Sequence, residues 1–171
     1  MADLSEPVGT DDHVRGADGG DLELVIYGDF ECPYCTAAQR VIARVESRLE
    51  GRLRLVFRHF PLEQRHPHAL RAAQVSEAAA AQGAFWEMHD ALYGNRGRLE
   101  DDDLLALARR LSLDAGRVEA ELEAGAHAGR VLRDKASGEA SGVTGTPAFF
   151  ANGALVTNGC DAGSLVAALL A

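Results

Sequence analysis

Apolar residues form short runs near both ends of the chain and follow a helical spacing in between. The runs at 22–27 and 53–60 are rich in strand-forming residues, and 36–49 has apolar residues at helical spacing. Two strands joined by a helix of this length form a βαβ unit. We therefore expect parallel strands with a right-handed crossover.

The segment 62–141 has a helical pattern almost throughout and is rich in alanine and leucine. We expect a block of helices inserted into a mixed fold. Its predicted breaks lie near Gly83, at 94–97, at 112–114 and near Gly125.

Strand-like runs return at 147–151 and 154–157, and Asn152-Gly153 lies between them. Both turn residues tolerate a positive φ, so this pattern predicts a hairpin. A last helix is expected to follow Asp161, whose side chain suits an N-cap, and to continue to the C-terminus.

Composition supports a folded, acidic protein. The 171 residues are 47% hydrophobic and carry a formal net charge of −9, enough apolar material for one domain with a core. Nucleic acids and anionic membrane surfaces both require a basic surface, so we expect neither as a partner.

Residues 1–21 are acidic and rich in glycine, and we expect a flexible N-terminal leader there. The leader has neither the basic and apolar regions of a signal peptide nor a run long enough to span a bilayer. We therefore expect a cytoplasmic location and no membrane insertion. In that reducing compartment, Cys-x-x-Cys pairs are usually catalytic or metal-binding.

Cys32 and Cys35 lie where the first strand pattern ends and the helix pattern begins. Free backbone N–H groups and the helix dipole at this position favour a thiolate at Cys32. Pro33 suits the first helical position. Residues three apart lie on one helix face, so the two sulfurs can close a small disulfide.

Four segments resemble the DsbA-like thiol-disulfide oxidoreductases of the thioredoxin superfamily. They are YGDFECPYC (27–35), FRHFPL (57–62), FWEMHDALY (85–93) and GVTGTPAFFANG (142–153). The resemblance implies an α/β, thioredoxin-like fold with an all-helical insertion. The thioredoxin-like domain would comprise 22–61 and 142–171, and the helical insertion 62–141.

The resemblance also assigns roles to individual residues. Cys32 is implied to be the solvent-facing, attacking thiolate and Cys35 the buried, resolving thiol. Pro147 resembles the cis-proline that faces the Cys pair. The resemblance implies that Pro147 binds substrate together with Thr146, Pro33 and Tyr34.

The implied activity is thiol-disulfide exchange with protein or peptide substrates. The expected partners are polypeptide thiols or disulfides and a second protein that restores the redox state of the pair. No cofactor is expected besides the redox-active Cys32–Cys35 disulfide, and no metal is expected.

Ile26 departs from the thioredoxin-like pattern, because many such proteins carry a buried acid six residues before the first cysteine. That acid shuttles protons for the resolving thiol. Asp29 and Glu31 are candidates to replace it through water, but we expect both to lie in an exposed loop. Helix-terminal groups are therefore expected to do most of the work of stabilising the Cys32 thiolate.

Two alternatives to catalysis remain. Cys32 and Cys35 could bind zinc or copper with His59, His66 and His68, although His66-Pro67-His68 does not have the ligand spacing of structural zinc sites. The chain could also be a non-catalytic thioredoxin-like adapter, or a regulatory domain beside a transporter. An adapter needs neither the Cys pair nor the Thr-Pro loop.

Cys160 makes the cysteine count odd. We expect it to be a small, partly apolar filler before the last helix, with a regulatory or intermolecular thiol as the alternative.

Overall fold

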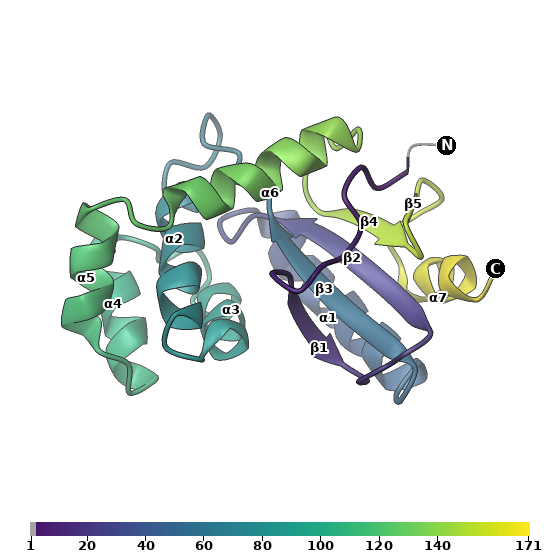
Figure 1. Ribbon diagram of the computed structural model, residues 1–171, viewed down its shortest axis with the longest axis horizontal. Helices are drawn as coiled ribbons and strands as arrows, with labels where there is room; N and C mark the ends of the chain where they lie inside the picture. The colour runs from purple at the N-terminus through teal and green to yellow at the C-terminus, as the bar shows by residue number, and fades with distance from the viewer. Residues whose placement is uncertain (1–2) are drawn as a thin grey trace.

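A five-stranded sheet and a separate group of helices make up the structure. The computed structural model describes residues 3–171 (Figure 1). The strands are β1 (His13–Gly16), β2 (Leu22–Gly28), β3 (Leu53–His59), β4 (Ala148–Ala151) and β5 (Ala154–Leu155). The helices are α1 (Pro33–Arg48), α2 (Ala69–Ala80), α3 (Phe85–Gly94), α4 (Asp101–Arg110), α5 (Ala115–Glu123), α6 (Ala128–Ala140) and α7 (Ala162–Leu170).

The sheet has the order β1-β3-β2-β4-β5 and is mixed. β2 and β3 are parallel and flank α1 in sequence, which confirms the predicted βαβ unit. β4 pairs antiparallel with β2, and β5 pairs antiparallel with β4. This sheet, with helices inserted between β3 and β4, confirms the thioredoxin-like α/β fold with a helical insertion.

Helices cover both faces of the sheet. On one face α1 and α7 bury Leu24, Ile26 and Phe149. On the other face lie Tyr27, Val56 and Phe150, and α6 crosses that face from the helical block toward β4 (Figure 1). Gly138 allows this crossing, because a Cβ there would lie 2.8 Å from the Phe60 ring and 2.9 Å from the Tyr27 ring.

A third core fills the helical block and reaches the end of the sheet. Met88, Leu92, Leu104 and Val118 are fully buried within it. The same cluster contains Phe30, Phe57, Cys32 and Cys35. The Cys pair therefore packs against the helical block as well as against its own helix.

Residues 3–21 are part of the fold, so the expectation of a flexible leader is wrong for this segment; residues 1 and 2 lie outside the described part. β1 adds an antiparallel edge strand to β3. The indole of Trp86 donates a hydrogen bond to the Val14 carbonyl at 3.2 Å.

Buried Arg58 also holds this segment. Its guanidinium donates to both carboxylate oxygens of Asp12, at 2.8 and 2.9 Å. It also donates to the backbone carbonyls of Glu6 and Pro7. These contacts join residues far apart in sequence, so local composition does not reveal them.

Two local signals at the end of the chain are confirmed. Asn152 and Gly153 have φ of 48° and 86° in the turn between β4 and β5. Asp161 caps α7 by accepting hydrogen bonds from the backbone N–H groups of Gly163 and Ser164. Within residues 3–171, no helix combines the length and the apolar character needed to cross a membrane.

Candidate active site

The two cysteines lie at the junction between the sheet and the helical block. Cys32 is the N-cap of α1, and Pro33 occupies the first turn as predicted. The Cys32 N–H donates to the Asp29 carbonyl at 3.2 Å, which fixes the turn between β2 and the helix. Both cysteines carry free thiols in this structure.

Cys32 is more enclosed than expected. Only 2% of its surface is exposed, compared with 1% for Cys35, so the prediction of a solvent-facing Cys32 is wrong. The Cys32 Sγ lies 3.6 Å from the carbonyl oxygen of Thr146, in the loop before β4. The Thr146–Pro147 peptide bond in this loop is cis. Next to the pair, Tyr34 is 73% exposed.

The surroundings of Cys32 favour its thiolate. The pKa of Cys32 is lowered to about 5, and the largest cause is a hydrogen bond from the Cys35 thiol. Burial opposes this shift. The Thr146 hydroxyl and the backbone N–H groups of Cys35 and Tyr34 lower the pKa further. The backbone N–H groups at the helix N-terminus thus help to lower the pKa of Cys32. They are not the main cause, which differs from what we expected from the sequence.

Cys35 has the opposite tendency. Its hydrogen bond to Cys32 and its burial raise the pKa of the Cys35 thiol well above the ordinary value. Cys35 therefore stays protonated while Cys32 is a thiolate. Two of the causes, the hydrogen bond and the negative charge, come from Cys32 and would be absent if its sulfur were bonded to another sulfur.

Asp29 is buried, which corrects the expectation that it lies in an exposed loop. Its carboxylate accepts hydrogen bonds from the backbone N–H groups of Glu31 and Leu62. It also pairs with His66 Nδ1 at 2.8 Å. These three contacts hold the turn before Cys32 against the segment that follows β3.

Glu31 is only partly exposed and makes a similar link. Its carboxylate accepts from the backbone N–H of His68 at 2.7 Å and pairs with His68 Nδ1 at 2.9 Å. Interaction with Glu31 raises the pKa of His68 above its ordinary value. Asp29 and Glu31 thus position the loop that carries the two cysteines.

Sequence reasoning did not single out Tyr93 as a site residue. It is buried in the cluster that contains both cysteines. Burial, together with the charges of Cys35, Asp29 and Cys32 and a hydrogen bond with Cys35, raises the pKa of Tyr93 well above its ordinary value. The phenol therefore keeps its proton and can donate to a thiolate at Cys35. The only sequence signal for Tyr93 was its position in the segment 85–93, which resembles the DsbA-like proteins.

Ile26, at the position of the missing acid, packs into the apolar core beneath α1 and α7.

The histidines pair with carboxylates rather than with the cysteines. His59, considered above as a metal ligand beside the cysteines, is fully buried and pairs with Glu77 at 2.7 Å. Within residues 3–171, the one group of three potential metal ligands is His13, His59 and Glu77. The cysteines are not part of it, so the structure does not assemble the Cys/His metal site considered above.

Cys160 is exposed, so the expectation of a partly apolar filler is wrong. It lies before α7, in a segment without regular secondary structure.

The Thr146 hydroxyl provides a test of the Cys32 environment. It is buried and has no hydrogen-bond partner among the described residues, so it is available to donate to a thiolate at Cys32, where it helps to lower the pKa. A hydrogen bond to a charged group contributes about 1.5 to 3 kcal/mol. We expect Thr146→Val to lower the acid dissociation constant of Cys32 roughly tenfold to a hundredfold. Ultraviolet absorbance of the thiolate against pH measures it, with exposed Thr144→Val as the control. Equal titration curves for the two variants would contradict this role.

The chain combines a thioredoxin-like sheet with a Cys-x-x-Cys pair at a helix N-terminus. A Thr-Pro loop faces the pair, and a group of helices is inserted into the fold. These features together define a class of thioredoxin-fold proteins. The family model described as "DSBA-like thioredoxin domain" matches residues 23–171. The chain therefore belongs to the DsbA-like thioredoxin family. Members of this family act on thiol substrates and are recycled by a redox partner.

Solved structures share this fold. A thioredoxin-like oxidoreductase from Silicibacter pomeroyi is 28% identical, with a TM-score of 0.84 over 94% of this chain and 91% of that one. BdbD from Bacillus subtilis is 18% identical, with a TM-score of 0.87 over 99% of this chain and 96% of that one.

Curated relatives are longer proteins. The chain is 45% identical over 154 residues to a Na(+)/H(+) antiporter NhaA 1 of Salinispora arenicola, a match that covers 90% of this chain and 24% of the relative. A Na(+)/H(+) antiporter NhaA of Herminiimonas arsenicoxydans is 41% identical over 167 residues, covering 97% and 26%. The chain thus spans about a quarter of the length of these relatives.

Proposed function

We propose that the chain is a thiol-disulfide oxidoreductase that oxidises dithiols in polypeptides through Cys32 and Cys35. The observation that carries this proposal is the difference between the two thiols. The pKa of Cys32 is lowered to about 5, whereas that of Cys35 is raised. One sulfur is thus an anion and a good leaving group at neutral pH, and the other holds its proton beside it.

The direction follows from the stability of the thiolate. A pKa of about 5 for Cys32 stabilises the reduced pair at neutral pH by roughly 2 to 3 kcal/mol relative to an unperturbed thiol. Stabilising the reduced form makes the disulfide a stronger oxidant, by on the order of 60 mV.

Each step of the proposed reaction is a disulfide exchange. A substrate thiolate attacks Sγ of Cys32 in the Cys32–Cys35 disulfide, and Cys35 leaves and takes up a proton. The second substrate thiolate attacks the substrate sulfur of the mixed disulfide and releases the Cys32 thiolate. The substrate loses two electrons to the pair, and a recycling partner removes them again.

Pro33, Tyr34, Thr146 and Pro147 form the proposed substrate contact. Tyr34 offers an exposed ring beside the pair, and the Thr146 carbonyl faces Cys32 from the opposite loop. An extended substrate segment could pair with the Thr146 backbone by a short form of strand addition.

The cytoplasmic location stays a prediction, and cell fractionation with an antibody to the chain tests it.

A second candidate function is a redox module of an ion transporter, and the antiporter relatives favour it. In this proposal the pair exchanges disulfides with cysteines of the transporter rather than with many polypeptides.

One trapping experiment tests both functions. In the Cys35→Ser variant the Cys32 thiolate can attack the disulfide of an oxidised substrate, the reverse of the proposed exchange, but no Cys35 thiol is present to displace that substrate. The variant should therefore retain its substrates covalently, and mass spectrometry identifies them. Several dithiol polypeptides support the general oxidoreductase, and a transporter as the main adduct supports the redox module. Absence of any adduct that depends on Cys32 would exclude both functions.

A further inference from the structure

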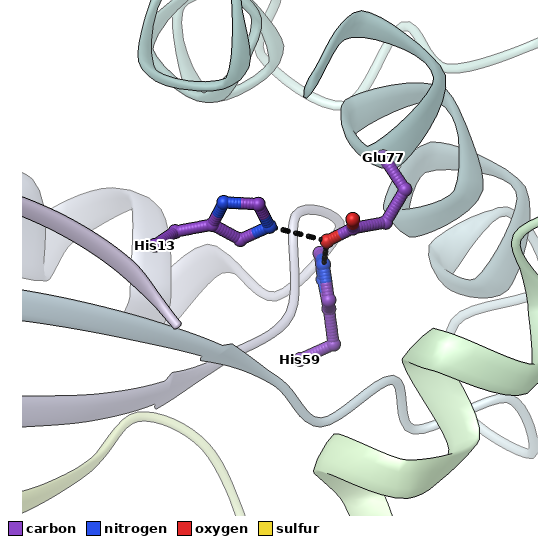
Figure 2. Close-up of side chains that lie close together, drawn as sticks. All are labelled: His13, His59 and Glu77. Atoms are coloured by element: carbon purple, nitrogen blue, oxygen red, sulfur yellow. Dashed lines mark hydrogen bonds and ion pairs between the residues drawn. The ribbon is translucent and has the colours of Figure 1, made fainter. Parts of the chain in front are cut away.

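The one group of three potential metal ligands among residues 3–171 lies between the sheet and the helical block. His13 comes from β1, His59 from the end of β3, and Glu77 from α2 (Figure 2). His13 Nε2 lies 2.6 Å and His59 Nε2 lies 2.7 Å from the same oxygen, Oε1 of Glu77. Three ligand atoms from three separate elements therefore converge on one point, within 4.8 Å of one another.

Aromatic rings fix the orientation of both imidazoles. The ring of His13 stacks on Phe85 at 3.5 Å, with 5° between the planes. The His59 ring meets Phe57 edge-on at 5.3 Å. The side chain of His59 is 1% exposed and that of Glu77 is 7% exposed, whereas that of His13 is 15% exposed. The ring contacts thus orient both imidazoles, and the cluster is most exposed on the His13 side.

We propose that His13, His59 and Glu77 form a binding site for a single Zn²⁺ ion. Two imidazole nitrogens and one carboxylate oxygen are a ligand set that zinc accepts, with a fourth position left for water. The partly exposed edge of His13 provides the path of entry. A bound ion would join β1, β3 and α2, and so would fasten the N-terminal segment to the helical block.

Zinc binding requires a small rearrangement. With bonds of about 2 Å, tetrahedral ligand atoms lie about 3.3 Å apart. The present distances to Glu77 are 2.6 and 2.7 Å, so each imidazole nitrogen must move away from Glu77 by about 0.6 to 0.7 Å. Each neutral ring must also carry its proton on Nδ1. The Nδ1 atom of His59 is buried and has no hydrogen-bond partner among the described residues. Ligating histidines usually have such a partner, so we expect weaker binding than at structural zinc sites.

Titration with zinc tests this site. The protein used is the full chain in which serine replaces Cys32, Cys35 and Cys160, because this variant has no thiol that could bind zinc. Calorimetry should show one equivalent bound, and Co²⁺ used in place of Zn²⁺ should give the visible absorption of a four-coordinate site. The melting temperature should rise with added Zn²⁺. Independence from the cysteines keeps this test separate from that of the proposed oxidoreductase.

Glu77→Gln distinguishes a metal site from a hydrogen-bonded bridge. The amide oxygen of glutamine still accepts hydrogen bonds from both imidazoles, but it is a poor zinc ligand. We expect at least a tenfold loss of zinc affinity in Glu77→Gln and in His13→Gln, with folding checked by circular dichroism. His127→Gln is the control, since His127 pairs with Glu121 at 2.6 Å in a partly exposed pair without a second imidazole. No binding, or equal binding by all variants, would overturn the proposal.

Discussion

Replacing Cys32 by serine is expected to reduce thiol-disulfide exchange to the rate of the reaction without protein. Cys32 is the sulfur with the lowered pKa of about 5, and a serine hydroxyl can neither form a disulfide nor act as a thiolate. The assay is oxidation of a reduced dithiol polypeptide by the oxidised chain, followed by counting free thiols.

Two further variants define the roles around Cys32. Cys35→Ser cannot form the Cys32–Cys35 disulfide, so it should not oxidise the dithiol. Its Cys32 thiolate should instead accumulate a mixed disulfide when the substrate offered already carries a disulfide, because no Cys35 thiol is present to displace it. Cys160→Ser is the matched control: Cys160 is exposed and lies outside the cluster that holds the pair, so exchange should continue at the normal rate. Full activity in Cys32→Ser would show that the chemistry lies elsewhere.

Asp12→Ala is expected to destabilise the protein by about 3 kcal/mol or more, because it leaves the buried Arg58 guanidinium without its carboxylate. The side chain of Arg58 is 4% exposed and that of Asp12 is 9% exposed, so water screens the pair little. Urea unfolding measures the change. Asp11→Ala is the control, since the neighbouring Asp11 is exposed, and it should change stability by less than about 0.5 kcal/mol.

The same pair predicts a pH dependence. Burial opposes the charge of Asp12, but hydrogen bonds from Arg58 and Gly9 outweigh it and lower its pKa. A carboxyl whose pKa is lower in the folded state adds stability above its unfolded pKa and loses it as the pH falls through the folded value. The stability difference between the original chain and Asp12→Ala should therefore shrink below about pH 4. A difference that does not change with pH would contradict an ionic role.

Local sequence signals were sufficient for much of the fold. The βαβ unit, the Asn152-Gly153 turn and the Asp161 cap each depend on neighbouring residues, and each is present. β1 was missed because four partly polar residues carry no strand pattern of their own. Its position depends on pairing with β3 and on contacts from distant side chains.

The site shows the same division. The helix N-terminus at Cys32 could be predicted from the adjoining strand and helix patterns. The burial of Cys32 could not, because it depends on packing against Thr146, which lies 114 residues away in sequence. The burial of Asp29 likewise depends on Leu62 and His66, whose donor groups reach it only once the chain has folded.

The proposal that the Cys32–Cys35 pair oxidises dithiols is tested most directly by its reduction potential, measured by equilibration with glutathione. Thioredoxin, whose attacking thiol has a pKa near 7, has a reduction potential of about −270 mV. With the Cys32 pKa at about 5, we expect a potential on the order of 50 mV more positive. A couple that never closes to a disulfide, or one with a potential at or below that of thioredoxin, would contradict the account.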